Sequence, residues 1–186
     1  MNMYSITLFL HIVGALGFFS AFALEFTALR QIQHAILSDQ TRIWMRILAG
    51  TRKLVDISGL TVLVSGIYMA VTAWRHVAWT GVALVSVVLL ILIAAILTRP
   101  RITALEKALA EEKGTLSQNF RELANHKQME LSLKTRMTIA LGIVFLMTVK
   151  PGLVGSLLTI AIAVIIGLAW AIVMPRHENA QKEFSN

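Results

Sequence analysis

Long apolar runs separated by short polar stretches dominate the chain. Five of these runs have about the length that an α-helix needs to cross a ~30 Å hydrocarbon core, and they lie at residues 4–25, 54–74, 80–98, 133–150 and 153–174. The pattern therefore predicts an all-α, polytopic membrane helix bundle with about five transmembrane helices. Because the remaining sequence is short, we expect a single integral membrane domain over residues 1–186.

The polar stretches between the spans also carry helical patterns. The first helix is expected to break near residue 38, after which residues 42–48 combine Arg, Trp and apolar side chains as in a helix that lies in the membrane interface. Residues 102–113 predict a charged surface helix that ends at Gly114. From Leu116 the apolar spacing predicts one uninterrupted helix that projects from the membrane and continues into the fourth span. We therefore expect amphipathic or extended helices on the cytoplasmic side.

Basic residues are concentrated on one side of the expected membrane. The chain has 17 Lys+Arg against 10 Asp+Glu, a formal net charge of +7. Stretches 26–53 and 99–136 and the C-terminal tail hold fifteen of these basic residues, whereas the other side has only Arg75 and Lys150. The positive-inside rule then predicts an N-terminus outside and a cytoplasmic C-terminus in a bacterial-type inner (plasma) membrane. Because the basic residues flank apolar spans, we expect contact with anionic lipid and not with nucleic acid.

The absence of cysteine narrows the possible chemistry. It excludes disulfides, iron–sulfur ligation, thiol catalysis and thiolate haem ligation in this chain. Any metal or haem would need His, Met, Lys or carboxylate ligands. Small residues recur at helical spacing in the second and fifth spans, and such ridges favour close helix packing or association into a homo-oligomer.

A histidine inside the first span is the main candidate for chemistry. An ionisable side chain is costly at membrane depth, so His11 is a candidate functional residue. Helical geometry places it on one face with small, aromatic and acidic residues, namely Gly14, Gly17, Phe18, Ala21 and Glu25. We expect this face to point into the bundle, with His11 about two helical turns below the outer surface.

Three interpretations of His11 are open. It could be an axial ligand of haem b, with the second position vacant or supplied by a residue of similar depth: His76, Met69, Met147 or Lys150. It could relay protons, because imidazole titrates near neutral pH. It could instead join two helices by a hydrogen bond.

A second group of ionisable residues is expected near the cytoplasmic surface. Glu25, Arg52, Asp56 and Arg136 have similar depths there. Because carboxylates at membrane depth usually pair with nearby arginines, we interpret the group as a charge-paired belt. Asp56 shares a helix face with the small residues of the second span and is expected to point into the bundle.

Three short segments resemble a known superfamily. Leu10-His11-Ile12, the second span centred on Gly66, and Val149-Lys150-Pro151 resemble the HemJ-type protoporphyrinogen oxidases and the copper-resistance-protein-D-like membrane domains. The chain is most similar to the "predicted integral membrane protein" branch of that group, in span order and layout over nearly its whole length. The resemblance implies a haem b ligand at His11, a propionate or substrate contact at Lys150, and redox or tetrapyrrole chemistry. The alternative is a non-catalytic small transporter or structural membrane subunit without a cofactor.

Overall fold

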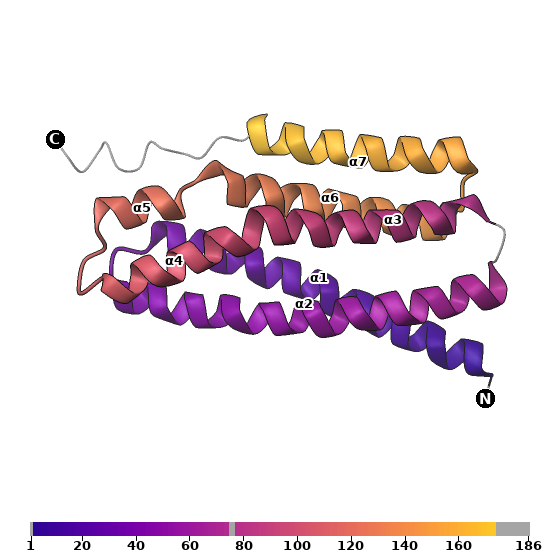
Figure 1. The fold of residues 1–186 in the computed structure, drawn as a ribbon, viewed down its shortest axis with the longest axis horizontal. Helices are drawn as coiled ribbons and strands as arrows, with labels where there is room; N and C mark the ends of the chain where they lie inside the picture. The colour runs from indigo at the N-terminus through magenta and orange to yellow at the C-terminus, as the bar shows by residue number, and fades with distance from the viewer. Residues whose placement is uncertain (1, 75–76, 174–186) are drawn as a thin grey trace.

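The described structure consists entirely of helices and their connections (Figure 1). The computed structural model describes residues 2–74 and 77–173. Along the chain these form α1 (Met3–His34), α2 (Ser38–Ala73), α3 (Ala78–Ile93), the π-helix η1 (Ala94–Thr98), α4 (Arg99–Glu111), α5 (Gln118–Ala124), α6 (Lys127–Val149) and α7 (Leu153–Val173).

Five helical segments of the described residues are long and apolar enough to cross a membrane. They are Met3–His34, Ser38–Ala73, Ala78–Glu111, Gln118–Val149 and Leu153–Val173. The third segment joins α3, η1 and α4, and the fourth joins α5 and α6. The prediction of an all-α bundle with about five spans is therefore confirmed.

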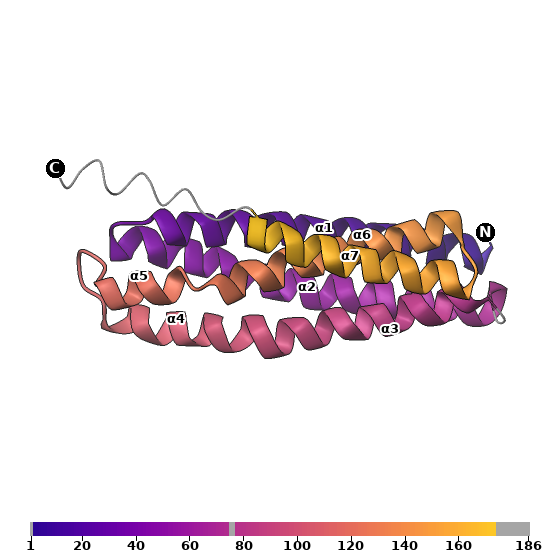
Figure 2. The same cartoon turned by 90° about the horizontal axis from the view of Figure 1, so that it is seen from above.

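The helices run roughly along one long axis and fall into two packed groups (Figures 1 and 2). In one group α1 and α2 form an antiparallel hairpin, and in the other α6 packs against α3 and α7. In the most apolar window of the fourth segment 61% of the residues are buried, against 11–22% in the other four, so α6 is the central helix. We call the end with the α1–α2 and α4–α5 turns the basic end, and the opposite end the N-terminal end.

Glycines allow α1 and α2 to pack closely. A Cβ added at Gly14 would lie 3.0 Å from Cγ2 of Val62, and one added at Gly17 would overlap Oγ of Ser58. A Cβ would be crowded at Gly14 and would displace the Ser58 side chain at Gly17, so the two glycines allow the helices to approach closely. The face of α1 that was expected to point inward does face α2, and its members His11, Gly14, Ala21 and Glu25 are buried.

The small residues of the fifth span also allow close helix packing, in this case of α7 against α6. Ser156, Ala163 and Gly167 are the buried residues of α7. A Cβ at Gly167 would lie 2.7 Å from Cα of Thr135 on α6. The ridge therefore brings α7 against the central helix.

Two expectations for the connecting stretches are wrong. Residues 42–48 do not form a separate interfacial helix, because α2 is continuous from Ser38 and its apolar positions there pack against α4 in the buried core. Arg42 donates to the main-chain oxygens of Leu109 and Glu112 at the end of α4, at 3.3 and 3.0 Å. The core that includes α4 therefore buries Met45 and Leu48 of this stretch, whereas Ile43 and Ile47 stay exposed.

The expected uninterrupted helix from Leu116 into the fourth span is interrupted between α5 and α6. His126 is the N-cap of α6, and its Nδ1 accepts a hydrogen bond from the main-chain nitrogen of Gln128. Arg101 of α4 donates to Oε1 of Gln128 at 3.0 Å. The capping contact and the arginine hold the new helix start, which the apolar spacing alone does not indicate.

The two turns at the basic end are joined through their backbones. The main-chain nitrogen of Ser38 donates to the oxygen of Gly114 at 2.8 Å, and that of Leu116 donates to the oxygen of Ile36 at 3.0 Å. Gly114 has a φ of 76°, in the left-handed region that glycine adopts without steric cost. This two-bond antiparallel bridge links the α1–α2 hairpin to the α4–α5 connection.

Candidate functional site

His11 lies in the seam between α1 and α2. The residue is 7% exposed, and its Nδ1 is 3.0 Å from Oγ of Ser65. The Ser65 hydroxyl donates to the main-chain oxygen of Thr61 at 2.5 Å, so its hydrogen is already used within α2. Nδ1 of His11 is then the donor to Ser65, and Nε2 carries the lone pair. Gly66 leaves room for the ring, since a Cβ there would lie 3.3 Å from Cε1 of His11.

The other residues expected near His11 are distributed between two helices. Met69 is buried on α2, one turn beyond Ser65, whereas Met147 is partly buried on α6. Lys150 ends α6 with a φ of 52°, and its Nζ is 4.0 Å from the centroid of the Trp74 ring. His76 lies outside the described residues. Within the described part of the chain, no hydrogen bond or ion pair joins His11 to Met147 or Lys150.

The residues around His11 supply one nitrogen that could hold a haem iron. Its imidazole has one nitrogen engaged by Ser65 and the other available as a ligand. Among residues 2–74 and 77–173, no group of three or more His, Cys, Asp and Glu side chains could hold a metal ion. Among the described residues, a second donor to a haem iron would have to be the thioether of Met69 or Met147 or the amine of Lys150.

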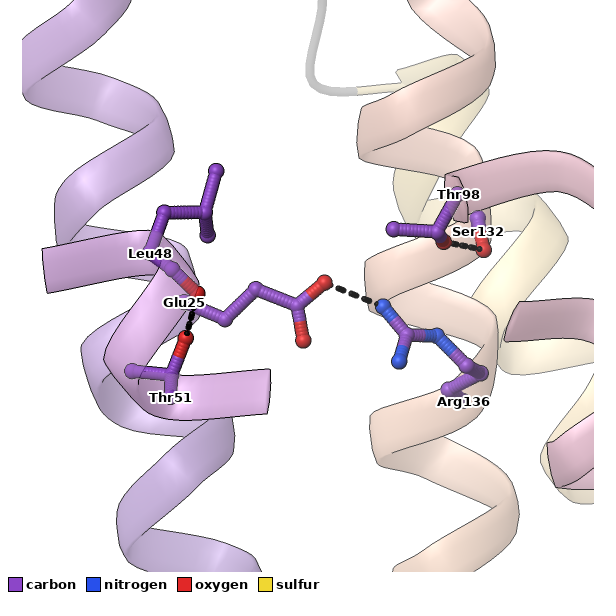
Figure 3. A network of polar contacts seen from close by, with 6 residues as sticks. All are labelled: Glu25, Leu48, Thr51, Thr98, Ser132 and Arg136. Carbon is purple, nitrogen blue, oxygen red and sulfur yellow. Dashed lines mark hydrogen bonds and ion pairs between the residues drawn. The ribbon is translucent and has the colours of Figure 1, made fainter. Parts of the chain in front are cut away.

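The charged residues of the first, second and fourth spans meet at a second place, nearer the basic end. Nη2 of Arg136 on α6 is 2.5 Å from Oε1 of Glu25 on α1, and these side chains are only 5% and 10% exposed (Figure 3). They line a cavity of about 180 Å³ between α1, α2, η1, α4 and α6. Arg52 and Asp56 of α2 line the same cavity, which we call the charged cavity.

The mouth of the charged cavity carries two looser ion pairs. Nη1 of Arg52 is 3.7 Å from Oε1 of Glu106, and Nη2 of Arg99 is 3.8 Å from Oδ1 of Asp56. The Asp56 side chain is 69% exposed, so the expectation that it points into the bundle is wrong. Its partner Arg99 lies at the start of α4, which holds the carboxylate at the surface of the cavity and not inside the helix packing.

Several residues of this region were not singled out in the sequence. Arg99 and Thr98 line the charged cavity, and Thr98 is hydrogen-bonded to Ser132 of α6 at 2.8 Å (Figure 3). Lys134 is buried on α6, where its Nζ is 2.9 Å from Oε1 of Glu130. The four-residue spacing of Glu130 and Lys134 is a signal for that ion pair, whereas no local pattern indicates Thr98.

Helix length and composition together define the chain as a multi-pass α-helical membrane protein in contact with the lipid bilayer. No protein-family model, curated protein or solved structure matches it. The resemblance of its short motifs to the HemJ-type and copper-resistance-protein-D-like group therefore stays a prediction.

Proposed function

We propose that the protein binds haem b or a related porphyrin through His11 and acts in redox or tetrapyrrole chemistry. The observation that supports this is the hydrogen bond from Nδ1 of His11 to Ser65, with the serine hydroxyl donating onward to Thr61. Histidines that ligate metals commonly donate their second ring N–H to an oxygen, which fixes the tautomer and orientation of the ring. A bound haem would supply an iron centre for electron transfer, while His11 would hold the iron and Ser65 would orient His11.

The test is the absorption spectrum of the full chain purified in detergent, before and after addition of haemin. We expect a Soret band that His11→Ala abolishes and Ser65→Ala shifts or weakens. His34→Ala is the matched control, because it removes an imidazole of α1 outside the seam and should leave the spectrum unchanged. A protein that stays colourless after haemin addition would refute the proposal.

The second candidate is a non-catalytic transporter or structural membrane subunit, in which His11 only joins α1 to α2. The close seam at Gly14 and Gly17 favours it, because a buried hydrogen bond between tightly packed helices needs no ligand. His11→Asn separates the two candidates, since an amide can replace the contact to Ser65 but is a poor haem ligand. If His11→Asn is as stable as the wild type and neither protein shows a haem spectrum, the structural role is favoured.

We further propose that the basic end faces the cytoplasm of a bacterial-type inner membrane and that the N-terminal end lies outside. The support is the distribution of Lys and Arg, which are concentrated in the stretches that form the basic end. Because the chain has no cysteine, Ser5→Cys and Asn119→Cys each give a single labelling site. An impermeant maleimide added to intact cells should label Ser5→Cys and not Asn119→Cys, and the opposite pattern would invert the topology.

A further inference from the structure

Three arginines converge on the charged cavity, and each is paired with one carboxylate, since Glu106 pairs with Arg52 just outside the lining. Its charged lining consists of three arginines, Arg52, Arg99 and Arg136, and two carboxylates, Glu25 and Asp56. The volume of about 180 Å³ is enough for several water molecules or a small oxyanion. The three guanidinium groups are the donors that an anionic occupant would use.

Arg136 has an unused donor in this lining. Its side chain is 5% exposed and its Nη2 is engaged by Glu25, while its Nε has no hydrogen-bond partner in the described structure. A buried guanidinium nitrogen without an acceptor is unfavourable, because it has lost water and gained no replacement. As the side chain stands, Nε is closed off from the charged cavity, so an acceptor oxygen there reaches it only when the Arg136 side chain turns.

The two arginines at the mouth are held only weakly. The Arg52–Glu106 and Arg99–Asp56 pairs are 3.7 and 3.8 Å apart, and the four side chains are 42–69% exposed. Exposed ion pairs at such separations contribute little, because water competes for both charges. Arg52 and Arg99 can therefore turn toward an incoming anion without leaving a buried carboxylate unpaired.

The backbone is irregular where α3 reaches the charged cavity. The π-helix η1, Ala94–Thr98, interrupts α-helical hydrogen bonding, and both its first and last residues line the cavity, next to Arg99. The Thr98–Ser132 hydrogen bond holds this turn against α6 (Figure 3). Short π-helices within longer helices often occur at functional sites, because the wider turn redirects the side chains that follow it.

From these observations we propose that the charged cavity binds a phosphate-class oxyanion. Arg52 and Arg99 bind it from the mouth, and the guanidinium of Arg136 lies at the floor. Guanidinium groups suit a phosphate because they offer several N–H donors in a planar fork. Glu25 lies 22 residues after Met3 in α1, about 33 Å along a helix, which is close to the thickness of a hydrocarbon core. The phosphate can therefore belong to a lipid headgroup or to a free anion.

The test is calorimetric titration of the detergent-purified full chain with two probes. These are inorganic phosphate and dioctanoyl phosphatidic acid, and dioctanoyl phosphatidylcholine shows whether acyl chains alone bind. The variant Arg52→Gln/Arg99→Gln should weaken binding at least tenfold. The matched control Arg30→Gln/Arg46→Gln removes the same charge from α1 and α2 outside the cavity and should bind as the wild type does.

The outcomes separate the source of the phosphate from the existence of the site. Binding of both probes, lost only in the cavity variant, supports a site for free phosphate, whereas binding of phosphatidic acid alone supports a lipid headgroup. Equal weakening in both double variants would show attraction to surface charge and overturn the proposal, and so would a failure of both probes to bind. Arg136→Lys, which keeps a charge for Glu25 but removes Nε, should also weaken binding, and wild-type affinity would remove Arg136 from the site.

Discussion

Removal of one partner of the Glu25–Arg136 ion pair should destabilise the protein strongly. The two side chains are 10% and 5% exposed and their charged atoms are 2.5 Å apart, so Glu25→Met leaves a buried guanidinium without its ion-pair partner. Two unit charges ~4 Å apart attract by about 4 kcal/mol at an effective dielectric constant of ~20. Truncation of buried pairs costs about 3–5 kcal/mol. We therefore expect the free energy of unfolding to fall by about 3–4 kcal/mol.

Equilibrium unfolding of the detergent-solubilised protein with sodium dodecyl sulfate, followed by tryptophan fluorescence, measures this change. Arg136→Met should cost a similar amount, whereas Glu25→Met/Arg136→Met should cost much less than the sum, because two apolar side chains leave no unpaired charge. Arg30→Met on the exposed side of α1 is the control. A change below about 1 kcal/mol for Glu25→Met, or additivity in the double variant, would refute this reasoning.

Two further perturbations test the packing and the basic end. Gly17→Ala should destabilise the α1–α2 seam by about 1–3 kcal/mol in the same unfolding assay, because the new Cβ overlaps Ser58, whereas Gly50→Ala in open space should not destabilise the chain. Outside the membrane spans, the side-chain and backbone hydrogen bonds from Ser117 lower the pKa of Glu112 below its ordinary value of 4.5. A carboxyl group with a depressed pKa stabilises the fold above its ordinary pKa and loses that contribution as pH falls through the folded pKa. The amide resonance of Ser117 should therefore shift only below about pH 4.5, and an unchanged profile in Glu112→Gln would contradict this.

The spans and the inward face of α1 were predictable because both depend on local sequence. A run of about twenty apolar residues identifies a membrane helix without any knowledge of its neighbours. The face of α1 that contains His11 and Glu25 follows from helical periodicity, because small and polar residues on an otherwise apolar helix mark the side that avoids lipid.

The contacts between distant segments were not predictable in the same way. Glu25 and Arg136 are 111 residues apart, and their pairing depends on how the α1–α2 hairpin docks on α6. Similar depth indicated that they could meet, whereas the small-residue face of the second span predicted an inward Asp56, which instead pairs at the surface with Arg99. The sequence predicts how deep a residue lies along its helix. The rotation of each helix about its axis is set by packing against its neighbours, which local sequence does not give.

The backbone bridge between the two turns at the basic end has a consequence for the order of membrane insertion. The α1–α2 hairpin is complete once residue 73 has been synthesised, but the bridge needs the main chain of Gly114 and Leu116. Those residues reach the hairpin turn only after the third span has crossed the bilayer and returned the chain to the same side. Until then, the main-chain oxygen of Ile36 and the main-chain nitrogen of Ser38 can form hydrogen bonds only with water. Closure of the bridge therefore requires that the first three spans have been inserted with both turns on the same side of the bilayer.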